Sequence, residues 1–119
     1  MSCGHGVLVV EDDDDLRESL SILLARRGFP VTTAANGKEA LDLIDPAVPP
    51  CMIILDLMMP EMDGWELRSW LLADPNLRKV PVVVVSGVAD LRRVDLHAAE
   101  YLKKPVDLDR LYGLVRALC

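Results

Sequence analysis

The chain has 119 residues, 51% of them hydrophobic, and its formal net charge at pH 7 is −6. This length and composition predict one folded domain with a single continuous fold, and they leave no room for a second domain. The negative charge argues against a nucleic-acid surface and against binding to anionic lipid. No apolar run approaches the length of a membrane-spanning helix, so membrane insertion is not expected.

The three cysteines, Cys3, Cys51 and Cys119, are far apart in the sequence and have no metal-ligand spacing. An odd number without a paired motif favours reduced thiols over a disulfide framework. The start of the chain lacks the basic segment and the apolar core of a signal peptide. We therefore expect a cytoplasmic protein, in which residues 1–5 form a short disordered tail and the domain occupies the rest of 1–119.

The first predicted strand, residues 7–10, is an unbroken apolar run rich in β-branched residues that leads directly into five acids, residues 11–15. Leucines at helical spacing follow and predict a helix that stops at Gly28. Negative charge is favoured at a helix N-terminus, which accounts for the last three acids. It explains less about Glu11 and Asp12, which stand at the end of the strand itself.

Residues 29–35 predict a weaker strand at the edge of a sheet, because Pro30 is tolerated only there or at a strand start. A short helix is expected over residues 38–44, with Ala40, Leu41 and Ile44 facing inward.

The central stretch of the chain is an apolar run, residues 52–55, that stops abruptly at Asp56 and continues into a turn containing Pro60 and Gly64. Four apolar residues without alternation are typical of a strand buried on both faces, as in a parallel sheet. Asp56 would then stand where that strand leaves the sheet. A single acid in this place is most often a loop or helix-capping residue.

The next predicted helix, residues 64–73, is expected to bury Leu67, Trp70 and Leu71. A fourth strand, residues 80–85, ends at Ser86.

The last part of the chain predicts a short, irregular helix over residues 89–99 and a brief strand over residues 101–103 that ends at Lys104 and Pro105. Asp107 is expected to cap the final helix, whose leucines and valine are spaced to face one side.

Strands that alternate with helices predict an α/β fold with a parallel sheet, right-handed crossovers and helices on both faces. Such connections place the carboxyl end of every strand at the same edge. The residues at these ends are Glu11, Asp12, Asp56, Ser86 and Lys104.

Three carboxylates at one place repel each other, by roughly 4 kcal/mol for two unit charges about 4 Å apart at an effective dielectric near 20. One lysine cannot compensate three acids, but a hard divalent cation such as Mg²⁺, or Mn²⁺ in its place, can. A carboxylate can also act as a nucleophile that forms an aspartyl phosphate. The set therefore has the parts needed for metal-assisted phosphoryl transfer to Asp56.

The motifs that carry this set resemble the receiver domain of two-component response regulators. These motifs are spread over almost the whole chain in the expected order. They are Glu11-Asp12-Asp13, Leu55-Asp56 through Asp63-Gly64, Ser86-Gly87, and Tyr101 through Lys104-Pro105. The resemblance implies a doubly wound, flavodoxin-like sheet in the order 2-1-3-4-5 with five helices.

The resemblance also assigns roles to residues. It makes Asp56 the acceptor of a phosphoryl group from the phosphohistidine of a sensor histidine kinase or phosphotransfer protein. Mg²⁺ or Mn²⁺ would be held by Asp12, by Glu11 largely through water, by Asp56 and by the backbone carbonyl of Met58. Ser86 and Lys104 would hold the phosphoryl oxygens.

Tyr101 matches the family's aromatic that turns inward when the Ser86 side moves toward the phosphate; without the resemblance it reads as a half-buried strand residue. The Lys104–Pro105 bond is an expected cis peptide. The protein would be a signalling domain that catalyses only its own phosphorylation and dephosphorylation. Its unidentified protein target would be controlled through the face formed by the fourth helix, the fifth strand and the fifth helix.

The chain departs from the family pattern between Ser86 and Lys104, where the interval is shorter by about a helical turn and His97 takes the place of a glycine. Met58 and Val88 flank the expected path of attacking water, and neither can orient it. Slow self-dephosphorylation is therefore predicted.

Three alternatives stay open. A phosphohydrolase with an aspartate nucleophile would need a second acid at position 58, where this chain has Met58. A docking-only pseudo-receiver would lack part of the acid, hydroxyl and lysine set. The third alternative is a receiver excised from a hybrid kinase or a longer regulator. Any receiver would also be compatible with a dimer formed on phosphorylation.

Overall fold

The computed structural model describes residues 6–56, 64–87 and 98–119. One sheet of five parallel strands, in the order β2-β1-β3-β4-β5, runs through the middle of the molecule. Its strands are β1 (Val7–Val10), β2 (Val31–Ala34), β3 (Met52–Asp56), β4 (Val82–Ser86) and β5 (Glu100–Lys103). The helices among the described residues are α1 (Asp14–Arg26), α2 (Gly37–Leu43), α3 (Gly64–Ala73) and α4 (Leu108–Leu118).

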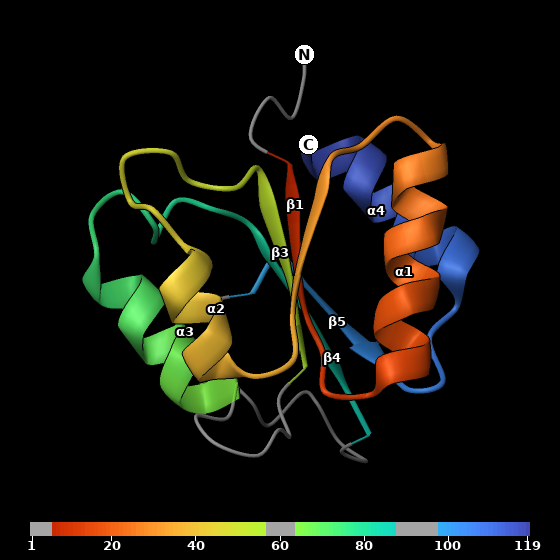
Figure 1. Cartoon of the computed structure of the whole chain (residues 1–119), viewed down its shortest axis with the longest axis horizontal. Coiled ribbons are helices and arrows are strands. Elements are labelled where there is room, and N and C mark those ends of the chain that lie inside the picture. The colour runs from red at the N-terminus through yellow and green to blue at the C-terminus, as the bar shows by residue number, and fades with distance from the viewer. Residues whose placement is uncertain (1–5, 57–63, 88–97) are drawn as a thin grey trace.

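The helices form a layer on each face of the sheet, with α1 and α4 on one side and α2 and α3 on the other (Figure 1). Successive side chains of a strand point to opposite faces, so β1 contributes to two cores. Val7 and Val9 pack with α1 and α4, whereas Leu8 and Val10 pack with α2 and α3. All residues of β3 and β4 are buried, which explains why both strands are apolar without alternation.

The starts of three helices are capped by side chains that accept main-chain hydrogen bonds. Asp13 caps α1, Asn36 caps α2 and Asp107 caps α4. At the other end of α1, Gly28 has a φ of +90°, a conformation that favours glycine. These local signals explain why the helix boundaries can be read from the sequence.

Gly6 fixes the entry into β1. Its φ is +79°, and a Cβ atom built on it would lie 2.6 Å from the carbonyl oxygen of Pro30. The amide of Val7 donates a hydrogen bond of 2.8 Å to that same carbonyl. Only glycine allows the chain to approach the start of β2 this closely.

The predicted strand order and parallel sheet are confirmed. Four helices are observed in the described part of the chain where five were expected. The expected helix over residues 89–99 falls almost entirely on residues 88–97, which lie outside the described residues. The same holds for the expected tail at residues 1–5.

The prediction that Trp70 is buried is wrong, because its side chain is 40% exposed. The buried stripe of α3 is formed by Gly64, Leu67, Arg68 and Leu71. Inclusion of Arg68 moves the centre of this stripe away from Trp70, since consecutive helical residues are about 100° apart.

The prediction of reduced, unpaired cysteines is also wrong, because Cys51 and Cys119 form a disulfide. The two residues are 68 positions apart in the sequence. They meet because β3 begins at the edge of the sheet where α4 ends (Figure 1). Among the described residues, no helix has both the length and the apolar composition required to cross a membrane.

Candidate functional site

Polar side chains gather at the carboxyl edge of the sheet. Glu11 and Asp12 follow β1, Asp56 is the last residue of β3, and Ser86 is the last residue of β4. Lys104 directly follows β5. The strands are in parallel register, with Asp56 beside Val85 and Ser86 beside Lys103. This register brings the five predicted site residues to one end of the molecule.

Three carboxylates converge there. Glu11, Asp12 and Asp56 each present an oxygen atom within 4.8 Å of the other two. Glu11 and Asp56 are each only 2% exposed, whereas Asp12 is exposed at the rim. Two of the three acids are therefore withdrawn from water in a place where they repel each other.

Lys104 partly compensates this charge. Its Nζ atom lies 3.1 Å from both carboxylate oxygens of Glu11 and 3.4 Å from Oδ2 of Asp56. Burial of the ammonium opposes its charged form, but the hydrogen bond to Glu11 and the charge of Asp56 outweigh this effect and raise the pKa of Lys104. The lysine therefore stays protonated between two acids.

The loop that carries Glu11 is held in place by its neighbours. The amide of Asp13 donates a hydrogen bond of 3.1 Å to the Glu11 carboxylate. Nη1 of Arg17 donates one of 2.8 Å to the Glu11 main-chain carbonyl, and the same guanidinium contacts Asp14. Arg17 was not singled out from the sequence. The sequence feature that could have identified Arg17 is its position: it is a basic residue in the first turn of a helix that follows a run of acids.

Burial and the hydrogen bonds and charge of the neighbouring carboxylates raise the pKa of Asp56 to about 8. Burial also opposes ionisation of Asp12, but hydrogen bonds with Asp56 and Glu11 outweigh it and lower the pKa of Asp12. When the pKa of one carboxyl group is raised and that of its neighbour is lowered, the two groups typically share one proton. In the metal-free protein that proton resides on Asp56.

The donor set fits Mg²⁺. Its oxygen ligands lie about 2.1 Å from the ion, so opposite ligands are roughly 4 Å apart. The three carboxylate oxygens, all within 4.8 Å of one another, already approach this spacing. Only hard oxygen donors are present in the cluster, which favours Mg²⁺ or Mn²⁺ over softer metals.

Ser86 and Tyr101 lie on the neighbouring strands. Ser86 is fully buried, and its main-chain carbonyl accepts a hydrogen bond of 2.9 Å from the amide of Lys104. Tyr101 is half-buried and packs against the core on the α2 and α3 side. The Lys104–Pro105 bond is cis, as expected.

Two predicted site residues fall outside the described part of the chain. They are Met58 and Pro60; Val88, expected beside the path of attacking water, and His97, which takes the place of a glycine, also lie outside it. Gly64, expected in the turn after Asp56, is buried and begins α3.

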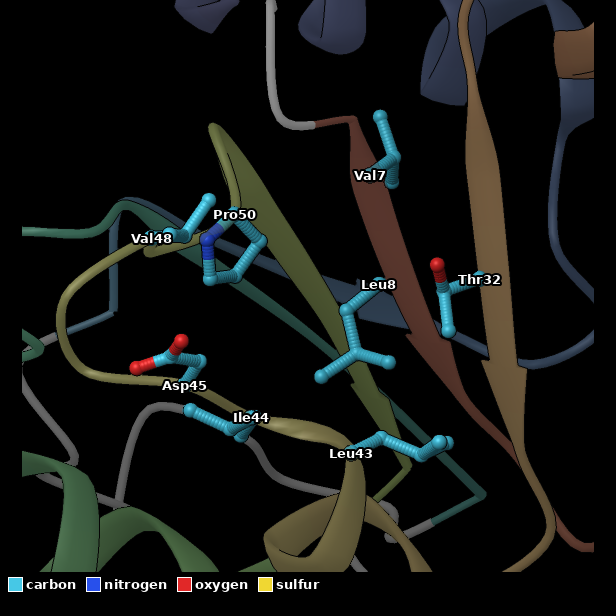
Figure 2. Close-up of a pocket in the computed structure, with 8 residues that line it drawn as sticks. All are labelled: Val7, Leu8, Thr32, Leu43, Ile44, Asp45, Val48 and Pro50. Atoms are coloured by element: carbon cyan, nitrogen blue, oxygen red, sulfur yellow. The ribbon is translucent and has the colours of Figure 1, made fainter.

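A separate cleft lies between β1, β2 and the connection from α2 to β3 (Figure 2). Its lining is mostly apolar and consists of Val7, Leu8, Thr32, Leu43, Ile44, Asp45, Val48 and Pro50. Asp45 is the single ionisable group among these lining residues. The cleft therefore lacks the convergent polar groups that phosphoryl or metal chemistry requires.

The model of the response regulator receiver domain matches residues 7–116. An uncharacterised 14.6 kDa protein from Leptolyngbya boryana is 39% identical over 95% of this chain and 88% of its own length. The response regulator MprA from Mycolicibacterium vanbaalenii is 37% identical over 94% of this chain, which spans about half the length of that relative.

Among solved structures, the response regulator protein TrrA from Thermotoga maritima, in complex with Mg²⁺-BeF, is similar with a TM-score of 0.81. The identity is 28%, and the match covers 95% of this chain and 97% of TrrA.

Proposed function

Since the chain belongs to the family of response regulator receiver domains, we propose that it is a signalling switch in which Asp56 accepts a phosphoryl group. The donor would be the phosphohistidine of a sensor histidine kinase or phosphotransfer protein. The observation that carries this proposal is the convergence of Asp56 with Glu11, Asp12 and Lys104 at the carboxyl edge of the sheet. Ligands of open α/β sheets bind at this edge.

Asp56 is suited to be the acceptor because it ends the central strand. Its main chain is fixed by pairing between β3 and β4, so its carboxylate has a defined position. In the transfer, an oxygen of Asp56 forms a bond to phosphorus while the bond from phosphorus to the imidazole nitrogen breaks. The product is an acyl phosphate on Asp56, and the donor histidine is returned without its phosphoryl group.

During this step the ammonium of Lys104 would contact the oxygens on which negative charge is placed. It now contacts both Glu11 and Asp56, so its ammonium is within reach of oxygens carried by either residue. Ser86, at the end of the adjacent strand, would offer its hydroxyl to another phosphoryl oxygen. Fixed donors of this kind stabilise the charge of a phosphoryl group during transfer.

Mg²⁺ or Mn²⁺ would be held by Glu11, Asp12, Asp56 and the backbone carbonyl of Met58. Bound there, the ion supplies positive charge to the phosphoryl oxygens and relieves repulsion among the acids. The three carboxylates fit this role by their oxygen chemistry and their mutual distances.

The conformational change caused by phosphorylation would be transmitted from the site to the surface through β4 and β5. Ser86 pairs with Lys103, and Val84 pairs with Tyr101 two residues earlier. A shift of Ser86 toward the phosphoryl group would therefore change the space beside Tyr101. The expected output is a changed face around β5 and α4 that controls a protein target and could form a dimer on phosphorylation.

Incubation with acetyl phosphate and Mg²⁺, followed by intact-mass measurement, tests the proposal. The wild-type protein should gain the mass of one phosphoryl group, and Asp56→Asn should gain none. Asp42→Asn, which changes an exposed aspartate of α2, is the matched control and should be modified like the wild type. An unmodified wild type, or modification of Asp56→Asn to the same extent, would contradict the proposal and favour a docking-only pseudo-receiver.

The same experiment extends to the lifetime of the modification. Met58 and Val88 cannot orient a water molecule, so the phosphoryl group should be lost slowly, over minutes or longer. Loss within seconds in purified solution with Mg²⁺ would contradict this. We also propose that the chain acts in the cytoplasm. The length of MprA, of which this chain matches about half, supports a place within a longer regulator, whereas the 14.6 kDa relative, matched over 88% of its length, supports a stand-alone domain.

A further inference from the structure

Cys51 and Cys119 lie at the edge of the sheet opposite the acids. Cys51 immediately precedes β3, and Cys119 is the residue that ends α4. Their side chains are joined, and their Cα atoms are 5.6 Å apart. This separation lies within the range of about 4.4–6.8 Å that a disulfide requires.

The two cysteines are positioned by the fold. The amide of Cys51 donates a hydrogen bond of 2.8 Å to the carbonyl of Gly6, and the amide of Cys119 donates one of 2.9 Å to that of Val115. Both side chains pack against the same apolar cluster, the one between the sheet and helices α1 and α4. Main-chain bonds and packing therefore place the two cysteines beside each other, at a separation that a disulfide can bridge.

Cys51 and Cys119 are both partly buried, so neither residue is enclosed in the core. Thiol–disulfide exchange requires that a small thiol or disulfide reagent reach one of the two sulfur atoms. A disulfide that a reagent can reach is reduced in a reducing compartment and forms when the compartment becomes oxidising.

We propose that Cys51 and Cys119 form a reversible, redox-sensitive tether that fastens the end of α4 to the start of β3. Oxidation by a small-molecule disulfide proceeds in two exchanges. One protein thiolate attacks the reagent and expels one reagent thiolate, and the second protein thiolate then attacks the resulting mixed disulfide and expels the other. Two protein thiols are oxidised to one disulfide, and one reagent disulfide is reduced to two thiols.

The tether acts on a helix end that has little other attachment to the core. The buried residues of α4 are Leu111 and Val115, and no residue of that helix after Val115 is buried. Arg116, Ala117 and Leu118 are exposed. Breaking the disulfide should therefore loosen the last turn of α4 more than any other part of that helix.

The tether also closes a large loop. The two cysteines are 68 positions apart, and the loop includes β3, α3, β4, β5 and α4. A cross-link over a loop of this length restricts the unfolded chain strongly. We expect the oxidised protein to melt roughly 5–15 °C above the reduced protein.

The test uses the full chain with Cys3→Ser, so that Cys51 and Cys119 are its two thiols. Samples are equilibrated with oxidised or reduced glutathione, alkylated with iodoacetamide and weighed by intact-mass spectrometry. The reduced sample should gain two alkyl groups and the oxidised sample none. Adding the reductant to the oxidised sample should restore both alkylation sites and lower the melting temperature.

Cys3→Ser combined with Cys51→Ser is the matched control, because its single remaining thiol cannot close the loop. It should take up one glutathione under oxidising conditions and show no rise in melting temperature. Amide exchange in residues 116–119 should slow at least severalfold on oxidation of the Cys3→Ser protein and should not change in the control.

Two results would overturn the proposal. The first is alkylation of both thiols after oxidation, which would show that the tether does not form. The second is a tether that forms without slowing exchange in the last turn of α4. Neither result depends on phosphorylation of Asp56, so the proposal and the proposed function can fail separately.

Discussion

The two edges of the sheet are built on opposite principles. At the carboxyl edge, Glu11, Asp12 and Asp56 are brought together although they repel each other, and Lys104 compensates only part of their charge. The amino edge is joined by main-chain hydrogen bonds, apolar packing and a disulfide. There the strands begin in the core, and Cys51 is joined to Cys119.

This difference shows how the fold can hold an unfavourable site. Repulsion and burial at the carboxyl edge lower the stability of the metal-free protein. Packing along both faces and at the amino edge supplies the stability that offsets this cost. Removal of an acid at the carboxyl edge and truncation of a buried apolar side chain should therefore have opposite effects on stability, and the following predictions test that separation.

The largest effect on stability is expected from Leu24→Ala in α1. Leu24 is fully buried against the sheet, and its truncation should lower the free energy of unfolding by about 2–5 kcal/mol. Because Leu24 lies near the C-terminal end of α1, and Glu11 and Asp12 precede the other end of that helix, Mg²⁺ affinity should not change. Urea unfolding and calorimetric Mg²⁺ titration measure the two quantities.

The matched control for Leu24→Ala is Ile22→Ala, since Ile22 is on the same helix and is 45% exposed. It should change stability by much less than 2 kcal/mol. Altered Mg²⁺ binding in Leu24→Ala at a temperature where it is folded would show that the two edges are not independent.

A smaller loss is expected from Lys104→Met. The change removes the ammonium that contacts Glu11 and Asp56 and should destabilise the metal-free protein by about 1–3 kcal/mol. Part of this loss should be recovered by adding Mg²⁺, which replaces the missing positive charge. Lys103→Met, at the exposed neighbouring position, is the control and should have little effect on unfolding in chelator.

The pH dependence of the metal-free protein should also reveal the site. The pKa of Asp56 is about 8 in the folded protein and near 3.9 when unfolded, so the folded state holds the extra proton between these values. The Asp56 carboxyl makes its full contribution to the free energy of unfolding below about pH 4. That contribution is lost as pH rises toward 8, by at most about 1.4 kcal/mol for each pH unit. Melting temperatures in chelator should show this fall.

Asp56→Asn is the comparison for that measurement, because asparagine does not titrate. Its melting temperature should change less than that of the wild type between pH 5 and pH 8. The lowered pKa of Asp12 acts in a different window, since its contribution is lost only below about pH 4. Equal pH dependence of wild type and Asp56→Asn would contradict the shared-proton interpretation.

The smallest effect, and the one with the opposite sign, is expected from Asp12→Asn. Above about pH 8, where Asp56 is ionised as well, removal of one negative charge should raise the stability of the metal-free protein by a few tenths to about 1 kcal/mol, since Asp12 is exposed and its repulsion is screened. Mg²⁺ should then stabilise the variant less than the wild type. Asp15→Asn removes a charge from the first turn of α1, where the helix dipole favours it, and should not be stabilising.

The parts of this structure that sequence reasoning could predict are those with a local cause. The apolar runs that become β3 and β4 reveal buried parallel strands, and Asp107 reveals the start of α4. The position of Asp56 at a strand end follows from the run that precedes it. Parallel topology then gathers the site, because all strand ends of one kind share an edge.

The features that could not be predicted depend on tertiary rotation and distance. Trp70 was assigned to the core of α3, but burial of Arg68 turns that helix so that Trp70 is exposed. The meeting of Cys51 and Cys119 depends on where two elements end in space, which their separation in the sequence conceals. The bond from Arg17 to the Glu11 carbonyl likewise arises only when α1 turns back beside β1.

The strand register described for β3, β4 and β5 limits how the chain could be altered in length. Side chains alternate between the two layers of helices, so one residue inserted within β4 would send Ser86 toward the opposite layer while leaving the apolar composition almost the same. An added residue in the connection between α2 and β3, at the far edge, would be absorbed by the loop. Strand length, rather than loop length, should therefore be the dimension in which this domain tolerates least variation.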